Sequence, residues 1–416
     1  MNQASNKSAG GINPAADIKP AVNITRLALI IAMLSGLGPF SVDTYLPAFT
    51  QIGKDLNANL VQLQITLGAY LLVFSVMNLF HGSISDAVGR RKVILTGLCV
   101  FAVASLGAAT SQSIEALWFW RGMQGLASGA GMSVGRAMGR DLTDGAQAQR
   151  LMGQAMVAFA VAPAIAPVIG GWILIWFSWR AIFVFLALVA CMIAVVVWFR
   201  IPETLALKDR QPLQFSNLMR GYREVFGQPQ FWRYGLSMCL GMAGFMLYVL
   251  SAPRYLQQLI GVDAQSFYYL FIPMTAGTMA GGWFASNMAG RVSLTKSVRI
   301  GHLVMLLSAA AHLASCVGID RFSWPPLPWA IVALPFYCAG AGIAMSPLQV
   351  LVVDIVPLRK GMVSSCLACM QSAISAGAAV ALAPFVWGAV WTMAVTTLAL
   401  AVLAAFIFQL EQRRHQ

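Results

Sequence analysis

The sequence predicts an all-α integral membrane protein with twelve transmembrane helices, arranged as two six-helix bundles. Of its 416 residues, 59% are hydrophobic and 10% are charged, whereas about 25% of the residues in a soluble domain are charged. Apolar runs of about 20 residues recur along the chain, and each can cross roughly 30 Å of hydrocarbon as a helix. Lys and Arg residues gather in alternate connections, which is the asymmetry expected of a membrane protein with a fixed orientation.

The predicted helices leave little chain for a water-exposed domain. Their continuous apolar runs exclude a transmembrane β-barrel, because barrel strands alternate in polarity over about 10 residues. The helices of the first bundle are predicted at residues 27–50, 60–81, 93–111, 114–138, 150–174 and 180–199. Those of the second bundle are predicted at residues 231–255, 265–289, 297–317, 327–350, 361–386 and 389–409.

A polar segment separates the two sets of helices and serves as a linker. The predicted organisation is an N-terminal tail (1–26), a first bundle (27–199), a linker (200–230), a second bundle (231–409) and a C-terminal tail (410–416). If both termini are cytoplasmic, the outer connections hold only Lys54, Arg180, Arg254 and Arg321 of the 27 basic residues. The positive-inside rule therefore predicts that orientation. The net charge of +13 reflects the same asymmetry, so we expect no nucleic-acid partner.

The sequence offers no sign of a bound cofactor or metal. Its seven cysteines all fall inside apolar segments, without metal-ligand or disulfide spacing, and we interpret them as small core residues. A nucleotide-binding G-x-x-x-x-G-K-[ST] loop is absent from the sequence. We therefore expect a process driven by an ion gradient, without a cofactor.

Two ionisable residues lie inside predicted helices, where charge is costly and usually faces a cavity. Burial disfavours the ionised form of Asp43, so this carboxylate is suited to binding and releasing a proton. Pro39 and Pro47 loosen the helix on either side of it; the alternative is a carboxylate permanently paired with a cation. Arg121 does not deprotonate, so its burial demands acceptors. Arg121 is either the electrostatic partner of Asp43 or a structural residue that joins helices by donating hydrogen bonds to backbone carbonyls.

The connection after the second helix reads Gly-Ser-Ile-Ser-Asp-Ala-Val-Gly-Arg-Arg-Lys over residues 82–92. Gly82 and Gly89 permit a tight turn, and Asp86 can cap a helix or pair with Arg90 and Arg91. By composition alone, this is a positively charged inner loop.

The spacing of this loop, G-x-x-x-D-x-x-G-R-R-K, resembles a signature of the major facilitator superfamily. The segment Arg121-Gly122-Met123-Gln124-Gly125 and residues 162–171 resemble two signatures of its drug/proton antiporters. Four further segments resemble the bicyclomycin/chloramphenicol (Bcr/CflA) branch, and they lie at residues 42–47, 136–142, 179–183 and 202–205.

The resemblance implies roles for particular residues. Asp43 would be the exchangeable proton site and Arg121 its coupling partner. A latch between the halves would be formed by Gly82, Asp86, Gly89, Arg90 and Arg91. A bent antiporter-type segment of the fifth helix would comprise Pro163, Ala166, Pro167, Gly170 and Gly171, although Ala162 and Ala166 stand where glycines are usual. The resemblance also implies a monomer in the bacterial inner membrane.

The expected function is export of a moderately hydrophobic small molecule, such as a drug, in exchange for protons by alternating access. Proton-coupled or facilitated uptake of a metabolite or siderophore-like compound on the same fold is the alternative, because fold does not decide direction. An enzyme is not expected, because no nucleophile, metal cluster or paired catalytic carboxylates converge in the helices. Aromatic and methionine side chains suit a partly apolar ligand, and the candidates for binding it are Tyr45, Phe245, Met246, Tyr248, Tyr268 and Gln371.

Overall fold

The computed structural model describes residues 24–143, 145–210 and 213–413. Most of the predicted N-terminal tail and the end of the C-terminal tail fall outside these residues. Within them, every predicted membrane segment is helical. Nine helical segments of the described chain are, by length and apolar composition, capable of crossing a membrane. The other three predicted segments are also helices, namely α5 (Ile114–Leu142), α6 (Gly145–Trp176) and α10 (Tyr268–Met288).

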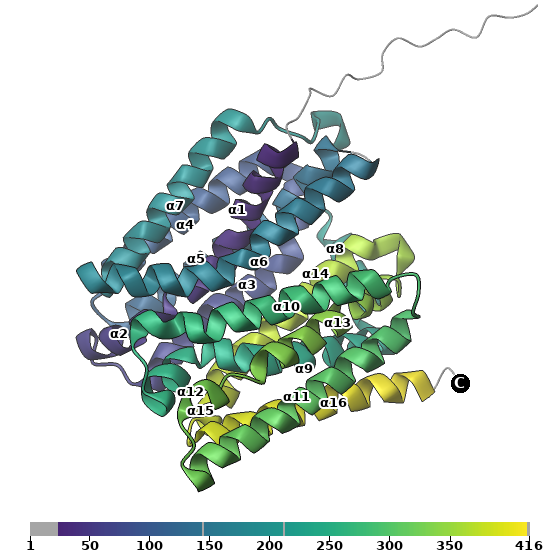
Figure 1. The fold of residues 1–416 in the computed structure, drawn as a ribbon. Helices are drawn as coiled ribbons and strands as arrows, with labels where there is room; N and C mark the ends of the chain where they lie inside the picture. The colour runs from purple at the N-terminus through teal and green to yellow at the C-terminus, as the bar shows by residue number, and fades with distance from the viewer. Residues whose placement is uncertain (1–23, 144, 211–212, 414–416) are drawn as a thin grey trace, which may run out of the picture.

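The first half of the molecule, residues 24–200, occupies the upper part of Figure 1, in purple to teal. Its first membrane segment is broken after Asp43, and a short turn and a 3-10 helix follow. Pro39 lies inside the last turns of that segment and Pro47 lies in the 3-10 helix, as expected where proline removes backbone donors. Besides α5 and α6, this half contains α1 (Ile24–Asp43), η1 (Leu46–Ala48), α2 (Phe49–Asp55), α3 (Leu60–Val88), α4 (Arg90–Ala109) and α7 (Trp179–Arg200).

The second half, residues 229–413, lies below it in green to yellow (Figure 1). Two of its membrane segments contain π-helical turns, which mark local departures from the regular hydrogen-bond ladder. Besides α10, its elements are α9 (Pro229–Leu250), η3 (Pro253–Ile260), η4 (Ala264–Phe267), α11 (Leu294–Phe322), α12 (Pro326–Trp329), α13 (Leu334–Val353), η5 (Pro357–Arg359), α14 (Lys360–Gly377), η6 (Ala378–Leu382), α15 (Ala383–Val386) and α16 (Val390–Arg413).

Each half packs around its own central helices. In the first half, α5 contacts α1, α3 and α4, while α4 also packs on α7. In the second half, α13 contacts α9, α10 and α11, while α16 packs on α9 and α11. Glycines permit the closest approaches; a Cβ atom on Gly170 of α6 would clash with the Thr44 carbonyl after α1.

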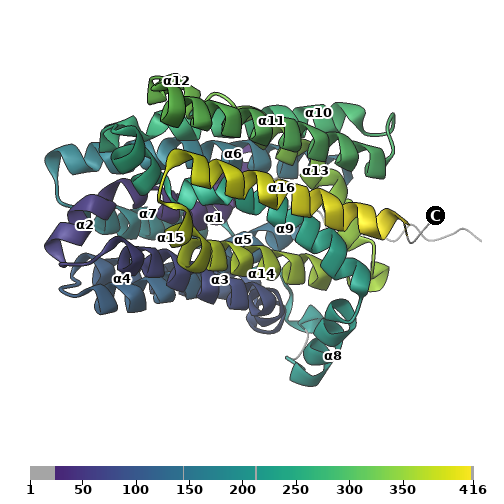
Figure 2. The ribbon, with the colours of Figure 1, turned by 90° about the horizontal axis from the view of Figure 1, so that it is seen from below.

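The halves meet along two seams. One joins α3 to α14 and the other joins α6 to α10, as the two views show (Figures 1 and 2). Between the halves in sequence, the linker contains a short 3-10 turn, η2 (Leu207–Asp209), and the helix α8 (Phe215–Phe226). In Figure 2, α8 lies at one end of the helix bundle. We call this the α8 end and the opposite end, which holds α2, the α2 end.

Several helices extend beyond the predicted apolar runs. The second helix continues to Val88 instead of ending at 81, and the ninth spans Leu294–Phe322 instead of 297–317. Hydropathy detects only the part of a helix that is as long as the hydrocarbon layer is thick. The backbone hydrogen bonds of these helices continue beyond that part. A side-chain cap fixes the beginning of α3, where Asn59 and Gln62 form a reciprocal capping box with bonds of 2.9 Å.

Candidate functional site

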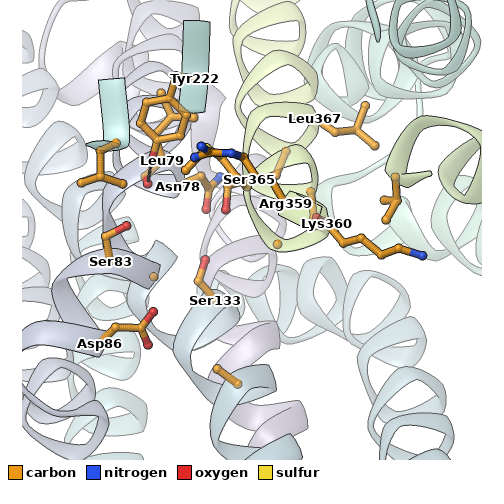
Figure 3. Close-up of a pocket in the computed structure, with 18 of the residues that line it drawn as sticks. Asn78, Leu79, Ser83, Asp86, Ser133, Tyr222, Arg359, Lys360, Ser365 and Leu367 are labelled. Atoms are coloured by element: carbon orange, nitrogen blue, oxygen red, sulfur yellow. Dashed lines mark hydrogen bonds between the residues drawn. The ribbon is translucent and has the colours of Figure 1, made fainter. Parts of the chain in front are cut away.

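A cavity of about 1080 Å³ lies between the halves at the α8 end. Figure 3 shows its wall, to which both halves and the linker helix contribute. The first half contributes side chains from the ends of α3 and α5, and the second half contributes side chains from α9, α13 and α14. The neutral polar members of this wall are Asn78, Ser83, Ser133, Gln214, Asn217, Tyr222, Gln349, Ser364, Ser365 and Gln371.

The α2 end of the molecule is closed by hydrogen bonds between the halves. Gln64 of α3 donates to the Leu250 carbonyl of α9 at 2.8 Å. Thr50 donates to the side-chain oxygen of Gln257 at 2.5 Å, and the Gln257 amide lies 3.4 Å from the Pro47 carbonyl. The cavity therefore communicates with one side of the protein only.

The predicted proton site, Asp43, is the last residue of α1 and is 5% exposed. The predicted partner, Arg121, is fully buried in α5. Among the described residues, no ion pair or hydrogen bond joins these two side chains. The structure thus places both groups in the core of the first half but leaves their charges unpaired with each other.

Arg121 is instead held between two aromatic rings. Its guanidinium carbon lies 4.8 Å from the ring centre of Tyr45 and 4.6 Å from that of Tyr70, within the range of a cation–π interaction. Its Nη1 donates to the Gln124 side chain at 2.7 Å, and Gln124 donates in turn to Ser105 at 2.7 Å. Nε and Nη2 of Arg121 are buried, and no described residue accepts a hydrogen bond from them.

Tyr70 connects this arginine to the helix that carries Asp43. Its hydroxyl oxygen lies 2.8 Å from Ser128 Oγ and 3.1 Å from the Gly38 carbonyl oxygen of α1, and its single proton is donated to one of them at a time. Sequence reasoning missed Tyr70 because nothing local to α3 links it to Arg121. Gln124 was detectable, because a glutamine three residues after a buried arginine lies on the same helix face.

The residues of the predicted latch form a charged cluster within the first half and the linker. Arg90 pairs with Asp86 at 3.3 Å and with Asp141 at the end of α5. The Arg90 amide donates to Glu203 at 2.9 Å, at the beginning of α4, where a carboxylate is favoured. In this part of the described chain, none of these ion pairs reaches the second half.

The other latch residues support the same turn. Gly89 has φ of +112°, and a Cβ atom there would lie 2.6 Å from Glu203 Oε2, so the position requires glycine. Arg91 donates to the Trp198 carbonyl at 2.5 Å and lies over the ring of that residue. Gly82 faces open space and lines the cavity.

The predicted antiporter-type segment lies in α6, which contacts α1 on one side and α10 of the other half. Pro163 and Pro167 are inside this helix. Ala166 is fully buried, and Gly170 and Gly171 are buried as well. The segment therefore lies where a bend in α6 affects the packing of both halves.

The six candidate substrate residues occupy different environments. Gln371 lines the cavity. Tyr45 packs on Arg121, whereas Tyr248 is fully buried and hydrogen-bonded to His312 at 2.8 Å. Phe245 and Met246 pack partly buried against the core, and Tyr268 is 38% exposed beside Tyr269. The other polar wall residues were missed because helix spacing alone does not identify which face borders the other half.

The charged side chains that line the cavity are paired. Besides Asp86 and Arg90, they are Arg359, which binds Glu224 of α8 at 3.0 Å, and Lys360, which binds Asp354 at 2.6 Å. Tyr222 of α8 donates to the Leu79 carbonyl of α3. Burial raises the pKa of Tyr222 to about 12, so its hydroxyl keeps the donated proton at neutral pH. The linker helix is thus attached to both halves.

Comparison with known proteins agrees with this architecture. The family model of the Major Facilitator Superfamily matches residues 28–380. Multidrug resistance protein D of Escherichia coli is 31% identical over 267 residues, which are 64% of this chain and 67% of that protein. The bicyclomycin resistance protein homolog of Haemophilus influenzae is 27% identical, over 84% of this chain and 86% of its own length.

Solved structures show the same fold. A bacterial homologue of the human lysosomal transporter Spinster, in an inward-facing and unoccupied conformation, superposes with a TM-score of 0.66. The match covers 94% of this chain and 97% of that chain, at 15% identity. The predicted fold, two bundles of six transmembrane helices, is confirmed. The chain belongs to the Major Facilitator Superfamily, in the bicyclomycin/chloramphenicol resistance branch of its drug transporters, and is a membrane transporter of small molecules and not an enzyme.

Proposed function

We propose that this protein exports drug-like small molecules from the cytoplasm in exchange for protons. The observation that carries the proposal is the cavity between the halves, open at the α8 end, together with the buried and unpaired carboxylate of Asp43. The drug-resistance names of the relatives support export of antibiotics such as bicyclomycin and chloramphenicol.

The same proposal includes an orientation. The basic residues Arg90, Arg91, Lys92, Arg359 and Lys360 lie toward the α8 end. The positive-inside rule therefore supports a cytoplasmic location for this end and for both termini, in a bacterial inner membrane. With that orientation, the cavity receives substrate from the cytoplasm. We expect a monomer that uses the proton gradient and no cofactor.

In this mechanism, Asp43 is the proton carrier. Protonation removes its charge and suits a closed, dry core, while release of the proton leaves a carboxylate that Arg121 can stabilise. Substrate in the cavity and a proton on Asp43 favour different arrangements of the first half. The halves then rock about the α3–α14 and α6–α10 seams, which carries the substrate out of the cell and the proton in.

The test uses Asp43→Asn in everted membrane vesicles with an established pH gradient and a pH-sensitive dye. Chloramphenicol or bicyclomycin is added, and proton efflux through the wild type is expected. Asp43→Asn should abolish this efflux, and its unfolding temperature should stay close to that of the wild type. Unchanged active export by the variant would refute Asp43 as the carrier. Compound-dependent proton movement only in right-side-out vesicles would instead support uptake.

A further inference from the structure

The environment of Arg121 is unusual for a buried cation. It is fully buried, yet its charge is neutralised by no carboxylate and only one of its donors has a partner among the described residues. An arginine buried without a carboxylate normally pays a large desolvation cost. The two rings at 4.6 and 4.8 Å supply the compensating attraction, because the negative faces of two tyrosines sandwich one guanidinium.

These rings are themselves rigidly placed. The Tyr45 hydroxyl lies 2.7 Å from Thr66 Oγ1 on α3, and the ring packs edge-on against Phe49 at 5.0 Å between centres. The Tyr70 hydroxyl bonds Ser128 and the Gly38 carbonyl. Both tyrosines are at least 98% buried. They therefore form a fixed aromatic cage, which we define as Tyr45 and Tyr70.

The cage contacts both the Arg121 guanidinium and the end of the helix that carries Asp43. Tyr45 lies two residues after Asp43 in the sequence. Ser41 lies two residues before Asp43, and its hydroxyl is 3.4 Å from that of Tyr70. The Tyr70 ring lies 4.6 Å from the Arg121 guanidinium carbon, and its hydroxyl lies 3.1 Å from the Gly38 carbonyl oxygen on the helix that ends at Asp43. Among the described buried residues of this half, Asp43 is the single carboxylate and Arg121 the single cation.

Other titratable groups lie on the helices around α1. α5, α6 and α7 pack on it, and α3 reaches it through the Tyr70 hydroxyl. Among the described titratable side chains of α3 and α5, Glu115 is exposed, Asp141 pairs with Arg90, and buried His81 lies beside Gly129 of α5. Residues 161–176 of α6 carry no ionisable side chain. Arg180 at the beginning of α7 binds Asp55 at 3.3 Å, away from the core, and Arg200 ends that helix. Arg121 is therefore the buried cation of the described first half that is available to pair with Asp43.

We propose that the aromatic cage is a holding site for Arg121, which keeps the guanidinium off Asp43 in the state that opens at the α8 end. While the rings hold the arginine, Asp43 can keep a proton. When Asp43 loses the proton, its charge attracts the two unpartnered donors of Arg121. Tyr45 and Tyr70 are thus positioning residues that set how readily Asp43 is protonated, and this rests on the proposed role of Asp43 in proton exchange.

The test measures protonation of Asp43 without any transported compound. Dicyclohexylcarbodiimide adds to a protonated carboxyl in an apolar site and leaves an acylurea that mass spectrometry locates. Purified protein in nanodiscs is labelled across a pH series, and the pH of half-maximal labelling at Asp43 is recorded. Asp43→Asn identifies the background signal.

Removal of a ring should release Arg121 toward Asp43. For Tyr70→Leu and Tyr45→Leu, we expect the pH of half-maximal labelling to fall by about one unit, because a nearby cation favours the ionised carboxylate. Tyr70→Phe keeps the ring but removes the hydrogen bonds that place it, so we expect a smaller shift than for Tyr70→Leu. The matched control is Tyr337→Leu, since Tyr337 is equally buried and bonds the Gly241 carbonyl at 2.9 Å in the second half; it should match the wild type.

Three results would overturn the cage. These are an unshifted profile in both leucine variants, an equal shift in Tyr337→Leu, and no labelling of wild-type Asp43 at any pH. If Tyr70→Leu does not fold, Tyr45→Leu alone decides. Failure of the proposed function is a separate result, because Asp43→Asn vesicles that still export would leave the labelling data unaffected.

Discussion

The two halves of the protein bury polar side chains in different ways. In the first half, Arg121 is a charged group with two donors that no described residue satisfies, and the buried Asp43 forms no ion pair with it. In the second half, the buried carboxylate of Glu411 is paired with Arg233, and neutral buried side chains are hydrogen-bonded. His312 binds Tyr248 at 2.8 Å, and Tyr255 donates to the Ala330 carbonyl at 2.5 Å.

This difference indicates a division of labour on one fold. A satisfied network rigidifies the region that contains it, so the second half is suited to be a scaffold. Unpartnered buried donors cost free energy, and an arrangement of the protein that supplies acceptors for them recovers this cost. We therefore expect the groups that change partners during the proposed cycle to lie in the first half.

The largest effect expected from this comparison is at Arg121. Arg121→Met should reduce proton-driven export by on the order of 100-fold, because each 1.36 kcal/mol of lost stabilisation costs about tenfold and a buried charge contact is removed. His312→Gln, which keeps a hydrogen-bonding group opposite Tyr248, should retain export within about threefold. Dye-based export in everted vesicles measures both. An equal loss of export in the two variants would show that the buried polar groups of both halves matter equally for transport.

A smaller effect is expected at two glycines in corresponding connections. Gly89 and Gly290 both have positive φ, +112° and +76°, so alanine at either costs about 1 to 3 kcal/mol of backbone strain. A Cβ atom on Gly89 also meets Glu203, whereas that on Gly290 meets nothing within 4 Å. Gly89→Ala should therefore lower the unfolding temperature more than Gly290→Ala. The reverse order would contradict the importance of the Glu203 contact.

The smallest effects are expected where α8 joins the halves. Tyr222→Phe removes a part-buried hydrogen bond to the first half and should cost about 1 kcal/mol. Glu224→Gln removes an ion pair with Arg359 whose side chains are 44% and 35% exposed, so about 0.5 kcal/mol or less is expected. Denaturant unfolding of the purified protein compares the two. A larger loss for Glu224→Gln would mean that the linker is held mainly by the second half.

Much of the fold was predictable because hydrocarbon thickness imposes the length of every helix. Apolar runs located all twelve segments, and their ends were missed where helices such as α3 and α11 continue into polar residues. Asp43 and Arg121 stood out from the sequence because charge inside an apolar run is rare. The rings around Arg121 were not predictable, because Tyr45 and Tyr70 reach it from different helices. The α8 helix was also missed. It is short and apolar on one face only, so it does not stand out as an apolar run within the polar linker.

The closed α2 end has a further consequence for a protein that works at a cell boundary. Its bridges between the halves are amides, a hydroxyl and carbonyls, and no ion pair of the described residues joins the halves there. Neutral contacts of this kind are insensitive to ionic strength and acidity, whereas exposed ion pairs weaken in salt. In the proposed orientation, the charged cluster around Arg90 lies on the cytoplasmic side. The uncharged hydrogen bonds of the α2 end lie on the outer side, where salt and pH vary. We therefore expect the hydrogen bonds that close the α2 end to be equally stable at low salt, at high salt and at acidic pH.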